Sequence, residues 1–193
     1  MALVELTIFG IPLILFSAAM LGFFTAYGVG ANDVANAMGT SVGSKVLTIS
    51  QAVLIAAIFE FLGAFFAGGG VTQTIRKGVI DPELFIGQQE ILIYGMISSL
   101  FAAGVWLLVA SIRGWPVSTT HTIVGAIVGF GIYALGSDEI NWSVVGNISL
   151  SWLTSPISSG LLAALIYWIC KEFIITKQSK FPVSYTHLTL PTI

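Results

Sequence analysis

The sequence predicts an all-α integral membrane protein with about five transmembrane helices plus a re-entrant or broken segment. Hydrophobic residues make up 56% of the 193 residues, only 8% are charged, and the mean hydropathy is +0.96. Soluble chains carry about 25% charged residues, so this chain has too few charges to cover a water-soluble globule. The apolar residues also fall in runs near the length of about 20 residues that crosses a bilayer as a helix. A lipid bilayer is therefore the expected surrounding.

The charge balance and the cysteine content exclude other classes. Seven Lys and Arg stand against nine Asp and Glu, which gives a net charge of -2 and no basic stripe for a nucleic acid. Cys170 is the single cysteine and lies in an apolar run, so we interpret it as a packing residue. No Lys or Arg precedes Lys45, which argues against a cleavable signal peptide. The first apolar segment is expected to stay in the protein.

Five apolar runs are long enough to be predicted as transmembrane helices. They are Ile8–Ala26, Ile49–Ala67, Ile91–Ile112, Val117–Leu135 and Ile157–Ile175.

Three intervening segments differ from these runs. The segment 29–48 is punctuated by glycine and polar residues but carries only Asp33 and Lys45 as charges, so we expect it to be membrane-buried and not helical throughout. The segment 142–153 is too short to cross and is predicted to be interfacial or re-entrant, or to extend a neighbouring helix. The segment 76–90 is the most polar internal connection and is expected to be solvated.

The first polar motif follows the first apolar run directly and reads GVGANDVANA over 28–37. An Asp buried in lipid must find a cation, a proton or a donor, because burying it unpaired costs several kcal/mol, of order 2–7 kcal/mol even for a neutral polar group. Gly28 and Gly30 would let the helix unwind and expose carbonyl groups. With the side chains of Asn32, Asp33 and Asn36 they would form the oxygen-rich ligand set that suits sodium. The alternative is that these polar residues only cap a helix.

The second polar motif, PVSTTH over 116–121, opens the fourth apolar run. Proline is favoured in a first helical turn, and the unpaired N–H groups of such a turn attract anions. Ser118, Thr119 and Thr120 add hydroxyl groups, so the motif suits a tetrahedral oxyanion. A plain helix cap is the alternative, and His121 is interpreted as a hydrogen-bonding residue before a proton relay.

Two further polar features accompany these motifs. Glu60 lies inside the second apolar run and would belong either to a coupling-ion site or to a structural hydrogen bond. The sequence SWLTSPISSG over 151–160 either starts a helix or supplies small residues for close helix packing. We expect residues 183–193 to be a non-native tail that resembles translated sequencing adaptor, which leaves residues 1–182 as the transmembrane part of the chain.

With these residues in view, the chain resembles the inorganic phosphate transporter (PiT) family of sodium- or proton-coupled symporters. GANDVANAMGTSVGS over 30–44, PVSTTH over 116–121 and SWLTSP over 151–156 carry the resemblance. It implies that residues 1–182 are the N-terminal half of an inverted-repeat transporter, with the C-terminal half missing. It also implies that Asn32, Asp33 and Asn36 bind the coupling cation, sodium or a proton, and that Ser118, Thr119 and Thr120 hold phosphate. Gly28, Gly30, Glu60 and His121 would support the site.

The resemblance leaves three alternatives open. The anion could be another oxyanion such as sulfate, the chain could be a non-transporting membrane scaffold, or two copies could assemble as a homo-oligomer. No cofactor beyond the coupling ion is expected. An enzyme is disfavoured, because the sequence lacks HExxH, Gly-x-Ser-x-Gly and Cys/His metal spacings. The expected location is a bacterial-type plasma (inner) membrane.

Overall fold

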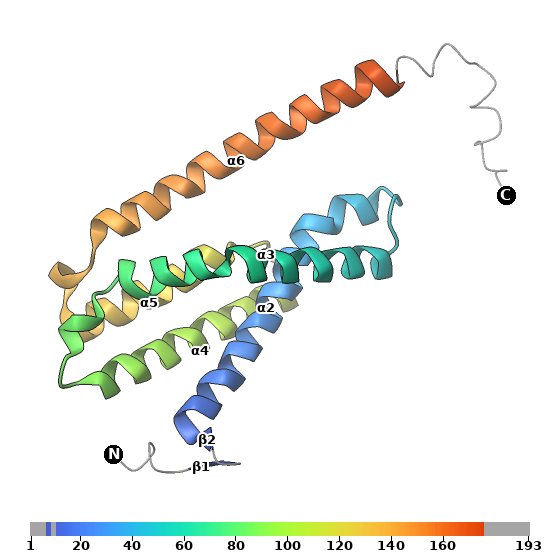
Figure 1. Cartoon of the computed structure of the whole chain (residues 1–193). Helices are drawn as coiled ribbons and strands as arrows, with labels where there is room; N and C mark the ends of the chain where they lie inside the picture. Colours follow the sequence, from blue (N-terminus) through green and yellow to red (C-terminus); the bar gives the residue numbers. More distant parts are fainter. Residues whose placement is uncertain (1–6, 9–10, 176–193) are drawn as a thin grey trace. The chain divides into compact units, whose positions relative to one another are not determined.

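A computed structural model of the chain describes residues 7–8 and 11–175. Most of these residues are helical (Figure 1). Two short antiparallel strands come first, with Thr7 paired to Pro12 and Ile8 paired to Ile11. In chain order the elements are β1 (Thr7–Ile8), β2 (Ile11–Pro12), α2 (Leu13–Gly43), α3 (Ile49–Gly78), the 3₁₀ turn η1 (Pro82–Phe85), α4 (Gln89–Arg113), α5 (Thr119–Leu135), the 3₁₀ turn η2 (Ser137–Glu139), α6 (Trp142–Cys170) and the π-helical turn η3 (Lys171–Ile175). The chain divides into two compact units, Met1–Val145 and Gly146–Ile193.

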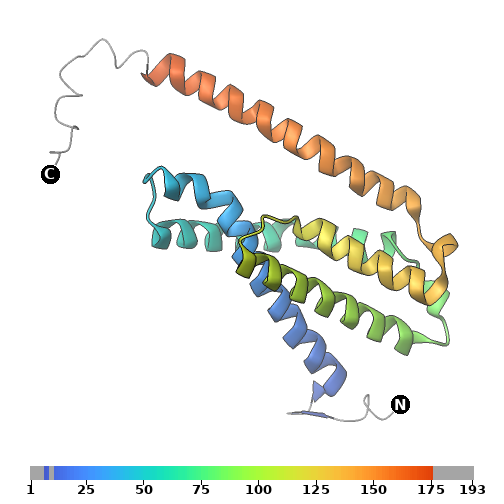
Figure 2. The same cartoon turned by 180° about the vertical axis from the view of Figure 1, so that it is seen from behind.

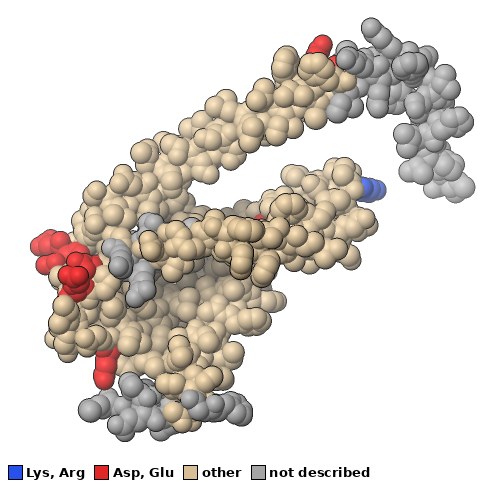
Figure 3. All heavy atoms as spheres, in the orientation of Figure 1, with Lys and Arg blue, Asp and Glu red and all other residues tan. Residues whose placement is uncertain are grey.

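The predicted apolar runs lie mostly in helices, although the first run begins in β1 and β2 and the fourth becomes helical only at Thr119. Within the described residues, four helical stretches are long and apolar enough to cross a membrane, and α5 is a shorter apolar helix of 17 residues. The four are Leu13–Gly43, Ile49–Gly70, Gln89–Arg113 and Trp142–Phe173. Over the face shown in Figure 3, charged groups gather mainly toward helix ends. The prediction of an all-α membrane protein is therefore confirmed, with four long spans and one short apolar helix.

In the first unit, α4 packs against both α2 and α5, as both views of the chain show (Figures 1 and 2). Small residues bring the backbones of α2 and α4 together, as is common between membrane helices. A Cβ atom placed on Gly28 of α2 would lie 3.0 Å from the Leu107 Cβ of α4. One turn away, the Thr25 hydroxyl donates to the carbonyl of Leu100 at 3.0 Å. This α2–α4 pair is the scaffold on which the polar motifs sit.

Helix α3 presents large aromatic side chains at its surface. Phe59 and Phe61 are each 68% exposed, and Phe66 is 80% exposed. A water-soluble monomer rarely shows apolar side chains so densely, whereas a lipid-facing helix requires them. The surface of α3 therefore agrees with its length as a membrane span.

Segment 29–48 is not helical throughout, as expected, because residues 44–48 form a turn, but the expected unwinding at Gly28 and Gly30 is wrong. Helix α2 continues unbroken through Gly28 and Gly30 and ends at Gly43. Gly28 is buried against α4 and serves close packing instead of unwinding. The chain then turns, and Thr48 starts α3 with a reciprocal pair of hydrogen bonds to Gln51.

The expected separation of segment 142–153 from the last span is also wrong, although its alternative, the extension of a neighbouring helix, is confirmed. Helix α6 runs from Trp142 to Cys170 with Pro156 inside it. Proline is tolerated within membrane helices where hydroxyl groups satisfy nearby carbonyl groups. Near Pro156, the Ser158 hydroxyl donates to the Thr154 carbonyl at 2.8 Å, and the Thr154 hydroxyl donates to the Ser151 carbonyl at 3.4 Å. Neither acceptor is the Trp152 carbonyl, which loses its helical N–H partner at Pro156.

The connection 76–90 exposes its described polar residues, including Asp81 and Glu83, as expected, but it buries three apolar residues. Helix α3 extends to Gly78, and Val79, Ile80 and Phe85 are at most 2% exposed. Ile80 pairs with Ile140, so this connection closes one end of the first unit. The predicted tail over 183–193 lies outside the described residues.

Candidate functional site

The connection between α4 and α5 is a tight turn that opens onto a capped helix. Gly114 ends α4 in the left-handed conformation, with φ 66° and ψ 28°. The N–H of Trp115 returns to the carbonyl of Ala110 at 2.8 Å. After Pro116, the Ser118 hydroxyl oxygen accepts the N–H of His121 at 3.3 Å and caps α5. The prediction that PVSTTH opens a helix is confirmed. The helix cap, which was the alternative interpretation of this motif, is present at Ser118.

Asn32 of α2 lies against this connection and is only 5% exposed. Its Nδ2 donates to the carbonyl oxygen of Trp115 at 3.0 Å. Its Oδ1 accepts the N–H of Val117 at 3.3 Å and the Nδ2 of Asn36 at 3.0 Å. The first polar motif therefore holds the backbone on both sides of Pro116.

Asp33, the next residue along α2, meets the start of α5. The Thr119 hydroxyl donates to the Asp33 Oδ2 at 3.1 Å, and both side chains are half-buried. The carboxylate thus lies by the N-terminus of α5, where the helix dipole favours negative charge. This hydrogen bond joins the two predicted motifs across 86 residues of sequence.

A small cavity of about 230 Å³, lined by both polar and apolar residues, lies beside Asn32. Asn36 and Ser111 line it, together with the backbone turn of Gly114, Trp115 and Pro116 and two alanines, Ala31 and Ala35. The Ser111 hydroxyl oxygen is buried, and among the described residues no hydrogen-bond partner reaches it. Such a cavity is roomy enough for water or a small hydrated ion, since one water needs about 10–15 Å³ of probe-occupied volume.

The sequence did not single out Ser111 or Trp115. Ser111 sits in the last turn of an apolar run, where a lone serine carries no distinct signal. Trp115 contributes through its carbonyl group, and no side-chain pattern reports a backbone acceptor. The Arg113 guanidinium lies 5.6 Å from the centre of the Trp115 ring, which is within the range of a cation–π contact.

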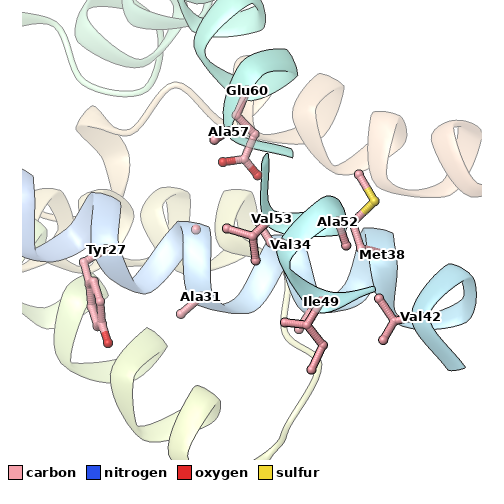
Figure 4. Close-up of a pocket in the computed structure, with 13 residues that line it drawn as sticks. Tyr27, Ala31, Val34, Met38, Val42, Ile49, Ala52, Val53, Ala57 and Glu60 are labelled. Atoms are coloured by element: carbon pink, nitrogen blue, oxygen red, sulfur yellow. The ribbon is translucent and has the colours of Figure 1, made fainter. Parts of the chain in front are cut away.

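The remaining predicted residues fall into two groups. Thr120, His121 and Asn36 are exposed, the first two on the opening turn of α5. Gly30 and Glu60 line a mostly apolar groove of about 590 Å³ between α2 and α3. Figure 4 shows Glu60 at one end of the α3 segment and Ile49 at the other, with Met38 and Val42 along α2. Glu60 is therefore placed beside the first motif's helix, on the α3 side, and not at the Asp33–Thr119 contact.

The site offers oxygen ligands and helix-terminal N–H groups, and lacks a soft-metal centre. Within the part of the chain that the structure describes, no three His, Cys, Asp or Glu side chains gather to hold a metal ion. Carboxylate, amide and hydroxyl oxygens suit sodium-like cations, and the first turn of α5 suits an anion. These features define an all-α integral membrane protein in which polar side chains of α2 meet the start of α5.

Comparison with known proteins identifies the family. The model of the family described as "Phosphate transporter family" matches residues 29–192. The chain belongs to this phosphate transporter family. A family of transporters is the expected class, in keeping with the prediction that the chain is not an enzyme.

Individual relatives agree with this result. The chain is 52% identical over 160 residues to a putative phosphate permease of Haemophilus influenzae, covering 83% of this chain and 38% of the permease. It is 49% identical over 162 residues to the chloroplastic inorganic phosphate transporter 2-1 of Arabidopsis thaliana, covering 84% of this chain and 28% of that protein.

A solved structure, titled the sodium-dependent phosphate transporter, matches with a TM-score of 0.76 and 46% identity. The match covers 82% of this chain and 39% of that one. The chain therefore spans well under half the length of the relatives described here.

Proposed function

We propose that the chain is one half of a secondary transporter that carries inorganic phosphate together with a cation. The observation that carries the proposal is the hydrogen bond from Thr119 to Asp33. It places the oxygen-rich motif of α2 directly against the helix start that suits an oxyanion. The printed names of the relatives, which include phosphate permeases, support phosphate as the anion.

In this proposal the cation binds on the α2 side of the junction. Asp33 supplies the negative charge, Asn36 and Asn32 are its polar neighbours, and Gly28, Gly30 and Glu60 support the helix around it. Sodium is the proposed cation, because the matching solved structure is named sodium-dependent and the ligand types are hard oxygens. A proton at Asp33 is the alternative.

The anion binds at the start of α5. Ser118, Thr119 and Thr120 with the first N–H groups of the helix would hold phosphate oxygens, and His121 lies on the same turn. A cation at Asp33 would lie beside the anion and offset part of its charge, so each ligand would raise the affinity for the other. This reciprocity couples the two ligands thermodynamically.

The complete transporter requires a second half that completes the site, in line with an inverted repeat. We propose that this half comes from a longer chain, with a homo-oligomer of two copies as the alternative. We also propose a bacterial-type plasma membrane, since the relative at 52% identity comes from a bacterium. Membrane fractionation of the native cell would test the location.

Phosphate uptake in a cell without its own phosphate transporters tests the function. One strain expresses this chain alone, and another expresses a chimera in which the chain replaces the matching segment of the Haemophilus influenzae permease. We expect sodium-dependent uptake of phosphate by the chimera, and none when choline replaces sodium. Uptake that continues in choline but stops with a proton ionophore would assign a proton instead.

Two outcomes would contradict the proposal. Uptake of sulfate in preference to phosphate by the chimera would change the substrate to another oxyanion. A chimera that reaches the membrane but transports neither anion would favour the scaffold alternative. Uptake by the chain alone would show that two copies assemble into a working carrier.

A further inference from the structure

Asn32 uses three of the four hydrogen-bonding positions of its side-chain carboxamide. A carboxamide oxygen has two lone pairs, and its nitrogen has two hydrogens. Here the oxygen accepts from both Val117 and Asn36, and the nitrogen donates to Trp115. A cation could bind the Asn32 oxygen only by displacing one of these donors. Asn32 is thus poorly suited to the ligand role that its motif suggests.

The three partners instead show what Asn32 does for the backbone. The carbonyl of Trp115 and the N–H of Val117 lie on either side of Pro116, whose nitrogen carries no hydrogen. The N–H groups of Gly114 and Trp115 bond back to α4, whereas the Trp115 carbonyl and the Val117 N–H have Asn32 as their partner. A backbone polar group that loses its partner away from water is costly. The Asn32 carboxamide donates to one carbonyl of this connection and accepts from one N–H, as the backbone of a neighbouring β-strand does.

The same pairing fixes the position of Thr119. Val117 is two residues before Thr119, and Asp33 directly follows Asn32 along α2. Holding Val117 against Asn32 therefore sets the distance between the Thr119 hydroxyl and the Asp33 carboxylate, which is 3.1 Å. We propose that Asn32 is a positioning residue that clamps the α4–α5 junction so that Thr119 meets Asp33. This proposal rests on the proposed function in one respect: phosphate and the cation are the ligands for which the junction is positioned.

Thr25 provides a matched control on the same helix. It is 4% exposed, close to the 5% of Asn32, and its hydroxyl shares its hydrogen between the Leu21 carbonyl of α2 at 2.9 Å and the Leu100 carbonyl of α4 at 3.0 Å. Removing this hydroxyl takes away a polar contact between α2 and α4 about two helical turns from Asn32. A general loosening of α2 against α4 would appear equally in both variants.

The first readout is amide hydrogen exchange over residues 115–120, measured by mass spectrometry on the chain in lipid nanodiscs without ligand. We expect N32A and N32D to exchange about tenfold faster there, as expected for the loss of one buried hydrogen bond. N32D is included because it keeps an acceptor for Val117 but places an oxygen against the Trp115 carbonyl. T25V should leave exchange over these residues unchanged. Equal exchange in N32A and the unmodified chain, or equal acceleration by T25V, would overturn the clamp.

The second readout separates positioning from ligation in the chimera. A cation ligand would tolerate N32D, since a carboxylate binds sodium at least as well as an amide, and the half-saturating sodium concentration would stay or fall. The clamp predicts that N32D raises the half-saturating concentrations of phosphate and sodium by about tenfold, while T25V leaves both unchanged. If the unmodified chimera takes up no phosphate, the proposed function fails, and the exchange experiment still decides the role of Asn32.

Discussion

The hydrogen bond between Thr119 and Asp33 can be removed without a change of shape by replacing Thr119 with Val. Hydrogen bonds to charged groups contribute about 1.5–3 kcal/mol, which corresponds to about 10- to 150-fold in binding at 1.4 kcal/mol per tenfold. Both side chains are only half-buried, so water replaces part of the lost contact. We therefore expect the lower end, an increase of about tenfold in the half-saturating phosphate concentration of the chimera.

Two control variants make this prediction specific. Thr119→Ser keeps the hydroxyl and should retain most of the affinity. Thr122→Val makes the same chemical change one turn further along α5, where the hydroxyl donates to the Ser118 carbonyl at 2.9 Å inside the helix. Initial rates of labelled phosphate uptake at fixed sodium give the half-saturation for each. If Thr119→Val and Thr122→Val behave alike, the contact with Asp33 has no part in binding.

Three further predictions concern stability, each measured as the unfolding midpoint in detergent micelles. A Cβ atom on Gly131 would lie 2.5 Å from the Ile140 Cδ1, whereas one on Gly129 would meet nothing within 4 Å. Gly131→Ala should therefore be about 1–3 kcal/mol less stable than Gly129→Ala because of overpacking. Both variants gain the same helix propensity, so that gain cancels in the comparison. Equal midpoints would show that Ile140 moves aside at no cost in stability. Gly114→Ala should cost about 1–2 kcal/mol, since φ is 66° there, and Gly114→Asn should cost less. Ser118→Ala should cost about 0.5–2 kcal/mol through the lost cap, while Ser118→Asp keeps the midpoint near that of the unmodified chain.

Hydropathy predicted the helices because lipid imposes a length and an apolar composition on each one. Composition could not place breaks, however. A glycine such as Gly28 can either unwind a helix or allow close packing, here against Leu107. The sequence is the same in both cases, and only the position of the partner helix distinguishes them. Pro156 likewise indicates a helix start in water, yet it lies inside α6 in an apolar span.

The site was predicted in its residue types and only partly in its roles. The capped start of α5 follows from local chemistry, since Ser118 bonds three residues ahead. The role of Asn32 depends on Trp115 and Val117, which lie 83 and 85 residues away. No local pattern contains that information. Asp33 and Thr119 were assigned to different ligands, the cation and the anion, and the sequence did not predict the hydrogen bond between them.

The wide sequence separation within the junction has a consequence for biosynthesis. A ribosome makes Asn32 and Asp33 more than 80 residues before their partners on the α4–α5 connection. During that interval α2 carries a carboxylate and a carboxamide that the later contacts cannot yet satisfy, and polar groups in lipid without partners are costly. The contacts that satisfy Asn32 and Asp33 at the junction therefore become available to α2 only after the start of α5 has been made.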